Sequence, residues 1–184
     1  MLVLILETSS EKGFIILADK DTPVRARALP GGPELSRVLA KEVYSLLDGL
    51  QPELIAVGTG PGSYTGVRVG VALAQGLSYG WGVPLLGFCS LRIFGPPPVL
   101  VDARSGKFYA WIETGPSLIS SDDPLLQQLP QIRSPHPALI RKHLLSPPVL
   151  SESNPDPSFI APLIWEQFLQ EGTPPLQFHY LSHP

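Results

Sequence analysis

A glycine-rich loop is the part of the sequence best suited to chemistry. Residues 58–70 read GTGPGSYTGVRVG, with five glycines in thirteen residues, and they continue the apolar run LIAV. A loop that joins a strand to a helix directs backbone N–H groups at an anion, so the first candidate chemistry is phosphate binding. The alternative is close packing, because glycine lets two stretches of backbone approach each other without a side chain between them.

Two strict phosphate-loop motifs are absent. A Walker A loop needs Lys followed by Ser or Thr after its last glycine, but the sequence has no lysine between Lys41 and Lys107. The dinucleotide fingerprint needs G-x-G-x-x-G and an acid about twenty residues later. Here the glycines stand at 60, 62 and 66, and residues 83–91 contain no acid. We therefore expect the loop to serve close packing, with a weak nucleotide contact as the alternative.

Few other residues have a type and spacing suited to catalysis. Cys89 is the single cysteine, so no internal disulfide is possible, and its place after an apolar run predicts a core position. The histidines all lie in the second half, at His136, His143, His179 and His183. None of them stands in an H-E-x-x-H motif. The G-x-S-x-G string GLSYG at 76–80 lies inside the predicted helix and not at a strand-to-helix turn, so it is no nucleophile elbow. We expect neither a metal site nor a peptidase site.

The elements around the loop follow from hydrophobic periodicity. Period-two runs predict strands, and a change to helical period predicts two helices, with Ser63 as the N-cap of the second. The predicted elements are strands at 2–7, 14–19, 23–29, 53–58 and 83–89 and helices at 34–50 and 63–80. This order predicts an antiparallel meander followed by strands joined through helical crossovers. It resembles the ribonuclease-H-like half of the actin-like ATPase superfamily.

The helix at 63–80 is apolar nearly all round. Between Glu53 and Asp102 the charged residues are Arg68 and Arg92 alone. A helix with so little charge is covered on all sides, and small residues four apart permit close backbone approach. Either the core of the chain itself covers this helix, or it presents a joint face with the helix at 34–50 to a partner. The pattern alone leaves both open.

Composition excludes some classes of function. Charged residues make up 16% of the 184 residues, where about a quarter is usual. The net charge of -3 gives no bulk attraction for a phosphate backbone, so a nucleic-acid role has to be local or borrowed from a partner. The apolar start MLVLILE meets Glu7 too early for a signal peptide or a membrane span. We expect a soluble cytoplasmic protein without membrane contact.

The composition changes near residue 96, which predicts two domains. Of the 22 prolines 16 lie from Pro96 onward, but only 3 of the 17 glycines do. We assign residues 1–95 to the ribonuclease-H-like domain and residues 96–184 to a reduced, divergent second domain. Proline at irregular spacing disfavours long elements, so the second domain is expected to be small and loop-rich.

Within this second half, three helices and one hairpin are predicted. PVLVDAR and KFYAWIE are typical of a hairpin that opens the domain. Short helices are expected near 124–129 and 136–145. A longer helix is expected at 156–170, where Asp156 suits the N-cap and Pro157 the first helical position.

Three segments carry a resemblance to a known family. GTGPGSYTGVRVGVALAQGLSYG closely resembles the signature of the TsaB (YeaZ) family, the partner subunits in bacterial threonylcarbamoyladenosine tRNA modification. LILETSS resembles the opening strand of that family with its Asp/Glu-Thr pair, and VDARSGKFYA is similar to its Asp-Ala-Arg segment. Together they span roughly residues 1–113. The resemblance implies a degenerate relative of the catalytic subunit TsaD with an actin-like fold.

The resemblance also implies a function and a set of partners. It implies a non-catalytic subunit that dimerises with a TsaD-like subunit and supports threonylcarbamoylation of the adenosine next to the tRNA anticodon. A TsaE-like ATPase is a further implied partner, tRNA is reached through the complex, and the chain alone is expected to homodimerise. Carried over by position, the interface comprises the helices at 34–50 and 63–80. Its predicted residues are Leu35, Val38, Leu39, Val43, Gly66, Val67, Gly70, Val71 and Ala74.

A nucleotide near the partner junction is the last implication. ATP or ADP is expected there, with no cofactor tightly bound by the chain. The predicted nucleotide-proximal residues are Glu7, Thr8, Gly60, Gly62, Ser63, Arg68 and Asp102. Glu7 and Asp102 occupy places where active actin-like ATPases hold carboxylates that position metal and water. That pair keeps a rival open, a free-standing actin-like ATPase or small-molecule kinase, and a self-associating protein unconnected with tRNA is a third hypothesis.

Overall fold

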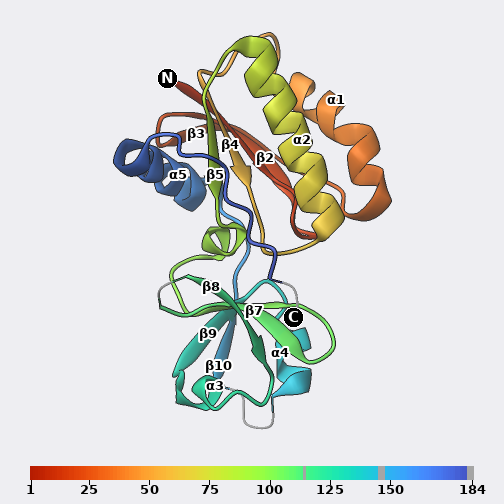
Figure 1. Cartoon of the computed structure of the whole chain (residues 1–184), viewed down its shortest axis with the longest axis vertical. Helices are drawn as coiled ribbons and strands as arrows, with labels where there is room; N and C mark the ends of the chain where they lie inside the picture. Colours follow the sequence, from red (N-terminus) through yellow and green to blue (C-terminus); the bar gives the residue numbers. More distant parts are fainter. Residues whose placement is uncertain (114, 145–147, 182–184) are drawn as a thin grey trace.

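Two five-stranded sheets divide the part of the chain that the computed structural model describes, residues 1–113, 115–144 and 148–181 (Figure 1). The first sheet has the order β3-β2-β1-β4-β5. Its strands are β1 (Leu2–Glu7), β2 (Phe14–Asp19), β3 (Thr22–Ala28), β4 (Leu54–Gly58) and β5 (Leu85–Phe88). β1, β2 and β3 form an antiparallel meander, while β4 pairs in parallel with β1 and β5. The predicted topology of the first half is confirmed.

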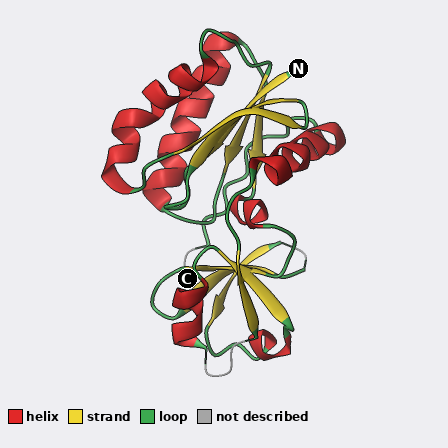
Figure 2. Cartoon of the chain, turned by 180° about the vertical axis from the view of Figure 1, so that it is seen from behind, coloured by secondary structure: helices red, strands yellow, loops and turns green. Residues whose placement is uncertain are grey.

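Two helices cover one face of this sheet and a third covers the other (Figure 2). A 3-10 turn at Gly32–Glu34 leads into α1 (Leu35–Leu47), and α2 spans Tyr64–Trp81. Ser63 caps α2 as predicted, because its hydroxyl accepts a hydrogen bond from the Gly66 N–H at 3.2 Å. Gly82, with φ of +66°, ends the helix in the left-handed region that glycine tolerates.

β1 is the centre of the molecule because it is buried on both faces. Leu4 and Leu6 pack in the core beneath α1 and α2. Val3 and Ile5 pack in a second core on the opposite face of the sheet. The uninterrupted apolar sequence of β1 follows from this double burial, since a strand with one solvated face would alternate. The carboxyl end of β1 is therefore fixed within the core, and the loop that begins with Thr8 starts from this fixed point.

The second sheet has the order β10-β9-β6-β7-β8 and a core of its own. Its strands are β6 (Val99–Asp102), β7 (Lys107–Trp111), β8 (Pro116–Ser120), β9 (Gln131–Ser134) and β10 (Val149–Glu152). The helices α3 (Leu125–Gln128) and α4 (Pro137–His143) accompany it, and a 3-10 helix at Ser90–Phe94 precedes it. The predicted hairpin is confirmed as the β6–β7 pair. The prediction of a loop-rich domain is wrong, because prolines occupy element starts such as Pro116 and Pro137 rather than interrupting the strands.

The last helix leaves the second domain and returns to the first. α5 (Pro157–Glu171) places Ile160, Ala161 and Ile164 in the core on the far side of the first sheet. Its N-cap is as predicted, because Asp156 accepts a hydrogen bond from the Ser158 N–H at 2.9 Å. The assignment of all residues from 96 to 184 to a second domain is therefore corrected. Residues 99–152 build the second sheet, and the chain then rejoins the first domain.

The segment after α5 runs back along the first sheet toward the domain junction (Figure 1). Leu176 packs near Gly87, where a Cβ would lie only 2.9 Å from its side chain. The His179 N–H donates to the Thr59 carbonyl at 3.1 Å, which fixes the segment against the glycine-rich loop. Residues far apart in the sequence are thus brought together at the junction.

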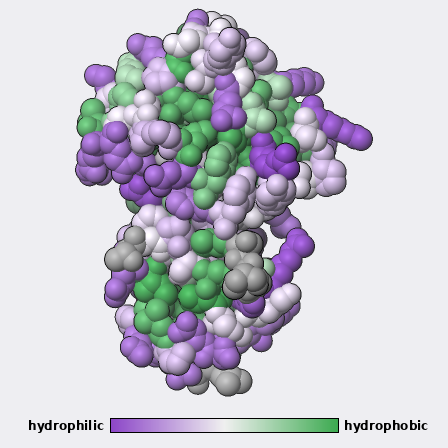
Figure 3. All heavy atoms as spheres, viewed as in Figure 1, coloured by the Kyte–Doolittle hydropathy of each residue, from purple (hydrophilic) through white to green (hydrophobic). Residues whose placement is uncertain are grey.

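The surface of the molecule mixes hydrophobic and hydrophilic side chains. Figure 3 shows hydrophobic side chains reaching the surface in both domains, with hydrophilic side chains mainly around the rim of the first. Large exposed side chains include Tyr44 and Tyr79 on the outer side of α1 and α2. Of the helices in the described ranges, none combines the length and the apolar character that a membrane crossing requires.

Candidate functional site at the domain junction

The glycine-rich loop and the start of α2 are packed against the loop that follows β1. A Cβ on Gly66 would lie 2.1 Å from the Thr8 carbonyl oxygen, and one on Gly70 would lie 2.1 Å from the Thr8 hydroxyl. A Cβ on Gly62 would lie 2.5 Å from the Ser9 carbonyl oxygen. These glycines are needed because the chain itself fills the space beside them. The sequence-based preference for close packing over phosphate binding is therefore confirmed at these positions.

Glu7 is the most unusual polar residue of this region. Its side chain is fully buried, and one carboxyl oxygen accepts a hydrogen bond from the Ser9 N–H at 2.5 Å. The other oxygen, Oε2, has no hydrogen-bond partner among the residues that the structure describes, and it lies where a Cβ on Gly58 would clash with it. Burial raises the pKa of the Glu7 carboxyl, because the charged form is deprived of water. An enclosed carboxyl whose charged form is disfavoured is suited to packing and is poorly suited to binding a metal ion.

An open cavity of about 520 Å³ lies between the first turn of α2 and the β6–β7 hairpin. Of the predicted nucleotide-proximal residues, Gly62, Ser63 and Asp102 line this cavity. Tyr64 and Thr65 of the first turn of α2 line it as well, next to the N-cap Ser63, and Glu11 adds an acidic side chain. The hydroxyl groups among these suit oxygen-rich ligands.

The second domain contributes charged and aromatic groups to the other wall. Arg104 lines the cavity in a left-handed turn with φ of +68°, and its N–H donates to the Asp102 carboxylate at 3.1 Å. His136 and Tyr109 complete this wall. From the sequence, no role was predicted for Arg104, His136 or Tyr109. For Tyr109, its position in β7 between the buried Phe108 and Ala110 was the signal, because alternation puts this residue on the opposite face.

The other four predicted nucleotide-proximal residues do not line the cavity. Glu7, Thr8 and Gly60 are buried in the chain itself. Thr8 donates its hydroxyl to the Gly66 carbonyl at 2.8 Å, and this hydrogen bond holds the β1 loop on α2. Arg68 lies on the exposed side of α2, with its guanidinium 5.2 Å from the centre of the Tyr64 ring. The predicted carboxylate pair is thus divided, with Asp102 at the cavity and Glu7 in the core.

The predicted interface residues are also mostly internal. Eight of the nine are buried within the chain, and Val38 is partly exposed. The helices therefore present other residues outward, and the assignment of the buried eight to a partner-facing surface is corrected. The reason is that the small residues of α2 admit the β1 loop, while their neighbours Val67, Val71 and Ala74 pack on the sheet. Whether these helices meet a partner stays a prediction.

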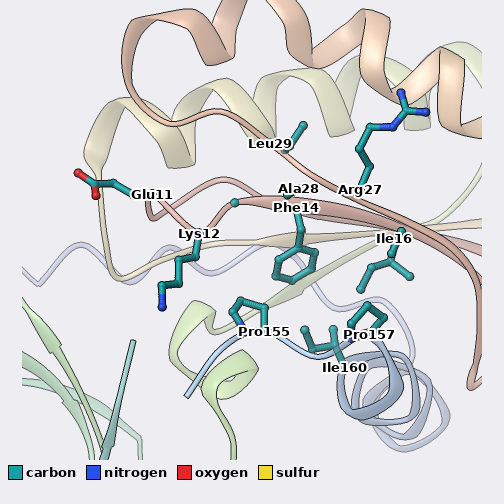
Figure 4. A pocket seen from close by; sticks show the side chains of 12 residues that line it. Glu11, Lys12, Phe14, Ile16, Arg27, Ala28, Leu29, Pro155, Pro157 and Ile160 are labelled. Carbon is teal, nitrogen blue, oxygen red and sulfur yellow. The ribbon is translucent and has the colours of Figure 1, made fainter. Parts of the chain in front are cut away.

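A separate hollow of about 410 Å³ lies between β2, β3 and the start of α5. Figure 4 shows Phe14, Ile16 and Ile160 facing one another there, with the charged end of Lys12 directed away from them. The Lys12 ammonium donates to the Pro135 carbonyl at 2.8 Å and pairs with Glu152 at 3.3 Å, so it ties the two domains together. This hollow is an apolar seam in the structure and holds no group poised for catalysis.

Cysteine and metal chemistry find little support in the described residues. Burial raises the pKa of the Cys89 thiol to about 12, so its reactive thiolate form is suppressed. In the ranges 1–113, 115–144 and 148–181, no three His, Cys, Asp or Glu side chains gather closely enough to hold a metal ion. His183 lies outside the described residues.

Comparisons with known proteins give consistent results. The family model described as TsaD, tRNA N6-adenosine threonylcarbamoyltransferase, matches residues 36–113. The Escherichia coli tRNA threonylcarbamoyladenosine biosynthesis protein TsaB is 44% identical over 91 residues, which cover 44% of this chain and 38% of that protein. The Bacillus subtilis protein of the same name is 32% identical over 122 residues, covering 59% of this chain and 53% of that protein. The matches thus span about half or less of these curated relatives.

Solved structures extend the likeness to nearly the whole chain. A Pseudomonas aeruginosa protein described as similar to the peptidase YeaZ superposes with a TM-score of 0.79 at 19% identity, covering 98% of this chain and 99% of its own. YeaZ from Pseudomonas aeruginosa superposes with a TM-score of 0.70 at 18% identity, covering 92% and 93%. At this identity the likeness establishes the fold, which is the actin-like, ribonuclease-H-like architecture. In its first half the chain is also similar in sequence to TsaB proteins and to the TsaD family model.

Proposed function

We propose that this chain is a non-catalytic subunit that pairs with a TsaD-like catalytic subunit in the cytoplasm and supports threonylcarbamoylation of the tRNA adenosine next to the anticodon. The names of the TsaB relatives support the pathway. The match to the TsaD family model supports a shared ancestry between the chain and the subunit we expect it to bind. A TsaE-like ATPase is the further partner of this proposal, and tRNA is engaged through the assembled complex.

The observation that carries the proposal is the outer face of α2. Among the described residues, no atom other than those of the neighbouring residues and the nearby backbone of α2 lies within 4 Å of the position where a Cβ on Gly76 or Gly80 would stand. Tyr79 between them is 92% exposed. Glycine inside a helix costs about 1 kcal/mol relative to alanine, and nothing in this chain requires these two. A face that combines small residues with an exposed aromatic side chain suits the close approach of a helix from another subunit.

The same face continues onto α1. Tyr44 is 58% exposed and meets Trp81 of α2 edge to face, with ring centres 6.3 Å apart. Aromatic residues are enriched at the centres of protein interfaces, where their large surface is removed from water. The proposed contact surface, called the outer face below, therefore consists of Tyr44, Gly76, Tyr79 and Gly80.

The interior of the site supports a non-catalytic role. The glycine positions that would cradle a phosphate are filled by Thr8 and Ser9, and Glu7 is held as a buried acid. An ATPase or kinase would instead need an accessible carboxylate to hold its metal. The suppressed Cys89 thiolate likewise argues against a cysteine peptidase. We propose that any ATP or ADP used in the reaction is held at the junction with the partner.

The test is co-purification of the full chain with the TsaD-like subunit of the same organism. Wild type should co-elute with it, and Gly76→Trp should not, because an indole would stand where the partner approaches. Leu169→Trp is the matched control, since Leu169 is 66% exposed on α5, away from the outer face. Equal co-elution of both variants, each folded by circular dichroism, would remove the outer face from the proposal.

A cellular measurement tests the pathway itself. Depletion of the protein should lower the amount of threonylcarbamoyladenosine in total tRNA, measured by mass spectrometry of the nucleosides. Restoration by wild type, and by Leu169→Trp but not Gly76→Trp, would link the modification to the outer face. Unchanged modification after depletion would favour a self-associating protein without a tRNA connection.

A further inference from the structure

The segment after α5 and the start of α2 together form a continuous cluster of flat side chains, in which one pair of rings is stacked and the next pair is tilted by 48°. The rings of Phe178 and Tyr180 are stacked with an interplanar angle of 3° and centres 5.5 Å apart. Tyr180 contacts Tyr64 with ring centres 5.4 Å apart, and the Arg68 guanidinium lies over Tyr64. The three rings are between 41% and 58% exposed. Such a large aromatic surface is ordered by mutual contact yet remains open to water.

A cavity of about 280 Å³ adjoins this cluster at the domain junction. Tyr64, Tyr109 and Tyr180 line it, together with Gly62, Val67 and His179. The three tyrosines come from α2, from β7 of the second domain and from the segment after α5. The cavity therefore exists only because the fold brings these distant segments together.

The larger polar cavity lies directly beside the aromatic one. Both are lined by Gly62, Tyr64 and Tyr109, so a ligand in one can extend into the other. The polar side offers the hydroxyls of Ser63 and Thr65 and the first turn of α2. A ligand that fits both would have a flat aromatic part joined to an oxygen-rich part.

The chemistry of the walls favours a nucleobase as the flat part. Tyrosine offers a ring face for stacking and a hydroxyl at its edge for hydrogen bonds. Stacking of bases on aromatic side chains is the usual way in which proteins hold unpaired nucleotides, and arginine adds to it. The hollow between β2, β3 and α5 differs, because proline and aliphatic side chains predominate there and offer little to a heterocycle.

We propose that the aromatic cavity binds an unpaired nucleobase, with its sugar and phosphate in the adjoining polar cavity. The base is supplied either by a free nucleotide or by an unpaired residue of an RNA chain. Because the protein carries a net charge of -3, the ring contacts and not bulk attraction supply most of the binding. The proposal goes beyond the proposed function and stands on this cavity alone.

Calorimetric titration of the full chain tests the proposal with three probes: AMP, a five-residue single-stranded oligoadenylate, and an oligomer of the same length that lacks bases. The variants are Tyr64→Ala and Tyr180→Ala, each expected to weaken binding of the base-containing probes about tenfold through lost stacking. Tyr180→Phe keeps the ring and should bind nearly as wild type does. Tyr79→Ala, on the outer face, is the control for removal of an exposed tyrosine from α2.

Each outcome decides between named alternatives. Binding of the oligoadenylate but not of AMP assigns the cavity to an RNA residue, whereas equal binding of the base in both assigns it to free nucleotide. Equal affinity for the base-free oligomer, unchanged affinity in Tyr64→Ala and Tyr180→Ala, or no binding of any probe at millimolar concentration would overturn the proposal. Co-elution with the TsaD-like subunit is measured separately, so failure of one experiment leaves the other interpretable.

Discussion

The glycines of α2 fall into two pairs that differ in what surrounds them. Gly66 and Gly70 face inward, where a Cβ on either would lie 2.1 Å from an oxygen of Thr8. Gly76 and Gly80 face outward, and among the described residues only their chain neighbours and the nearby backbone of α2 come within 4 Å of a Cβ position. The first pair is required by contacts inside the chain. The second pair lowers the intrinsic stability of the helix with no internal contact to offset it.

The two pairs of glycines lie in one sequence motif, but one pair concerns the folding of the chain and the other concerns its association with a partner. The inward pair fixes the β1 loop and so determines the fold of the junction. The outward pair leaves a narrow, accessible strip beside Tyr79, which is where a partner helix can approach. A bulky substitution at Gly70 consequently tests folding, and one at Gly76 tests association.

Gly66→Ala should have the largest effect. The nearest atom to the new Cβ is the Thr8 carbonyl oxygen, which belongs to the backbone and cannot rotate away. We expect the free energy of unfolding to fall by about 3 kcal/mol or more, measured by urea denaturation. A loss below about 1 kcal/mol would show that the β1 loop moves aside easily. Gly66 would then not be required by contacts inside the chain.

Gly70→Ala should be less severe and partly reversible. The nearest atom is here the Thr8 hydroxyl, a side-chain group, so a loss of about 2–3 kcal/mol is expected. Thr8→Ala removes that hydroxyl and should recover about 1 kcal/mol in the Gly70→Ala background. The same substitution should recover nothing in the Gly66→Ala background, because the backbone carbonyl remains. Additive effects in both backgrounds would contradict the geometry.

The Glu7→Gln variant should gain stability relative to wild type as the pH rises. Burial raises the pKa of Glu7, so the folded chain retains a proton that the unfolded chain has already released. The stability supplied by the neutral acid is complete below the unfolded pKa near 4.5 and is lost as pH rises through the folded pKa. Glutamine has no such proton, so the difference in urea midpoint should widen from pH 4.5 up to the folded pKa and level off above it.

Glu11→Gln is the control for that measurement, because it removes a negative charge from an exposed position of the same loop. Parallel pH courses for wild type and Glu7→Gln would show that the buried carboxyl is not held neutral. Such a result would also reopen the carboxylate pair with Asp102 as a metal-binding arrangement.

The first domain could be predicted from the sequence because its elements carry strong local signals. β1 and β4 are uninterrupted apolar runs, Ser63 and Gly82 mark the ends of α2, and Asp156 and Pro157 mark the start of α5. The strands β8, β9 and β10 were missed, because four or five residues are too few to show a period. The tertiary position of α5 was missed because an apolar helix face does not identify the core that it joins.

The site was predicted less well than the fold, and the reason is physical. Residues on the inward face of α2 were assigned to a partner because glycine, alanine and valine occur on both its sides, so hydropathy hardly distinguishes inside from outside. The outward positions of Arg68, Gln75 and Tyr79 were the better signal. The aromatic cavity could not be predicted at all, since Tyr64, Tyr109 and Tyr180 meet only through long-range folding.

Gly76→Ala should have the smallest effect and the opposite sign. Because a Cβ at this position meets no atom of another described element, alanine improves the helix without a clash, and the free energy of unfolding should rise by about 0.5–1 kcal/mol. The urea midpoint of the isolated chain measures this gain. In the presence of the TsaD-like subunit the same methyl group should weaken co-elution, since it occupies the strip that a partner helix would use. A variant that is more stable alone and associates less well would separate the two roles of glycine in α2, whereas a destabilised chain would show that the outer face is already covered.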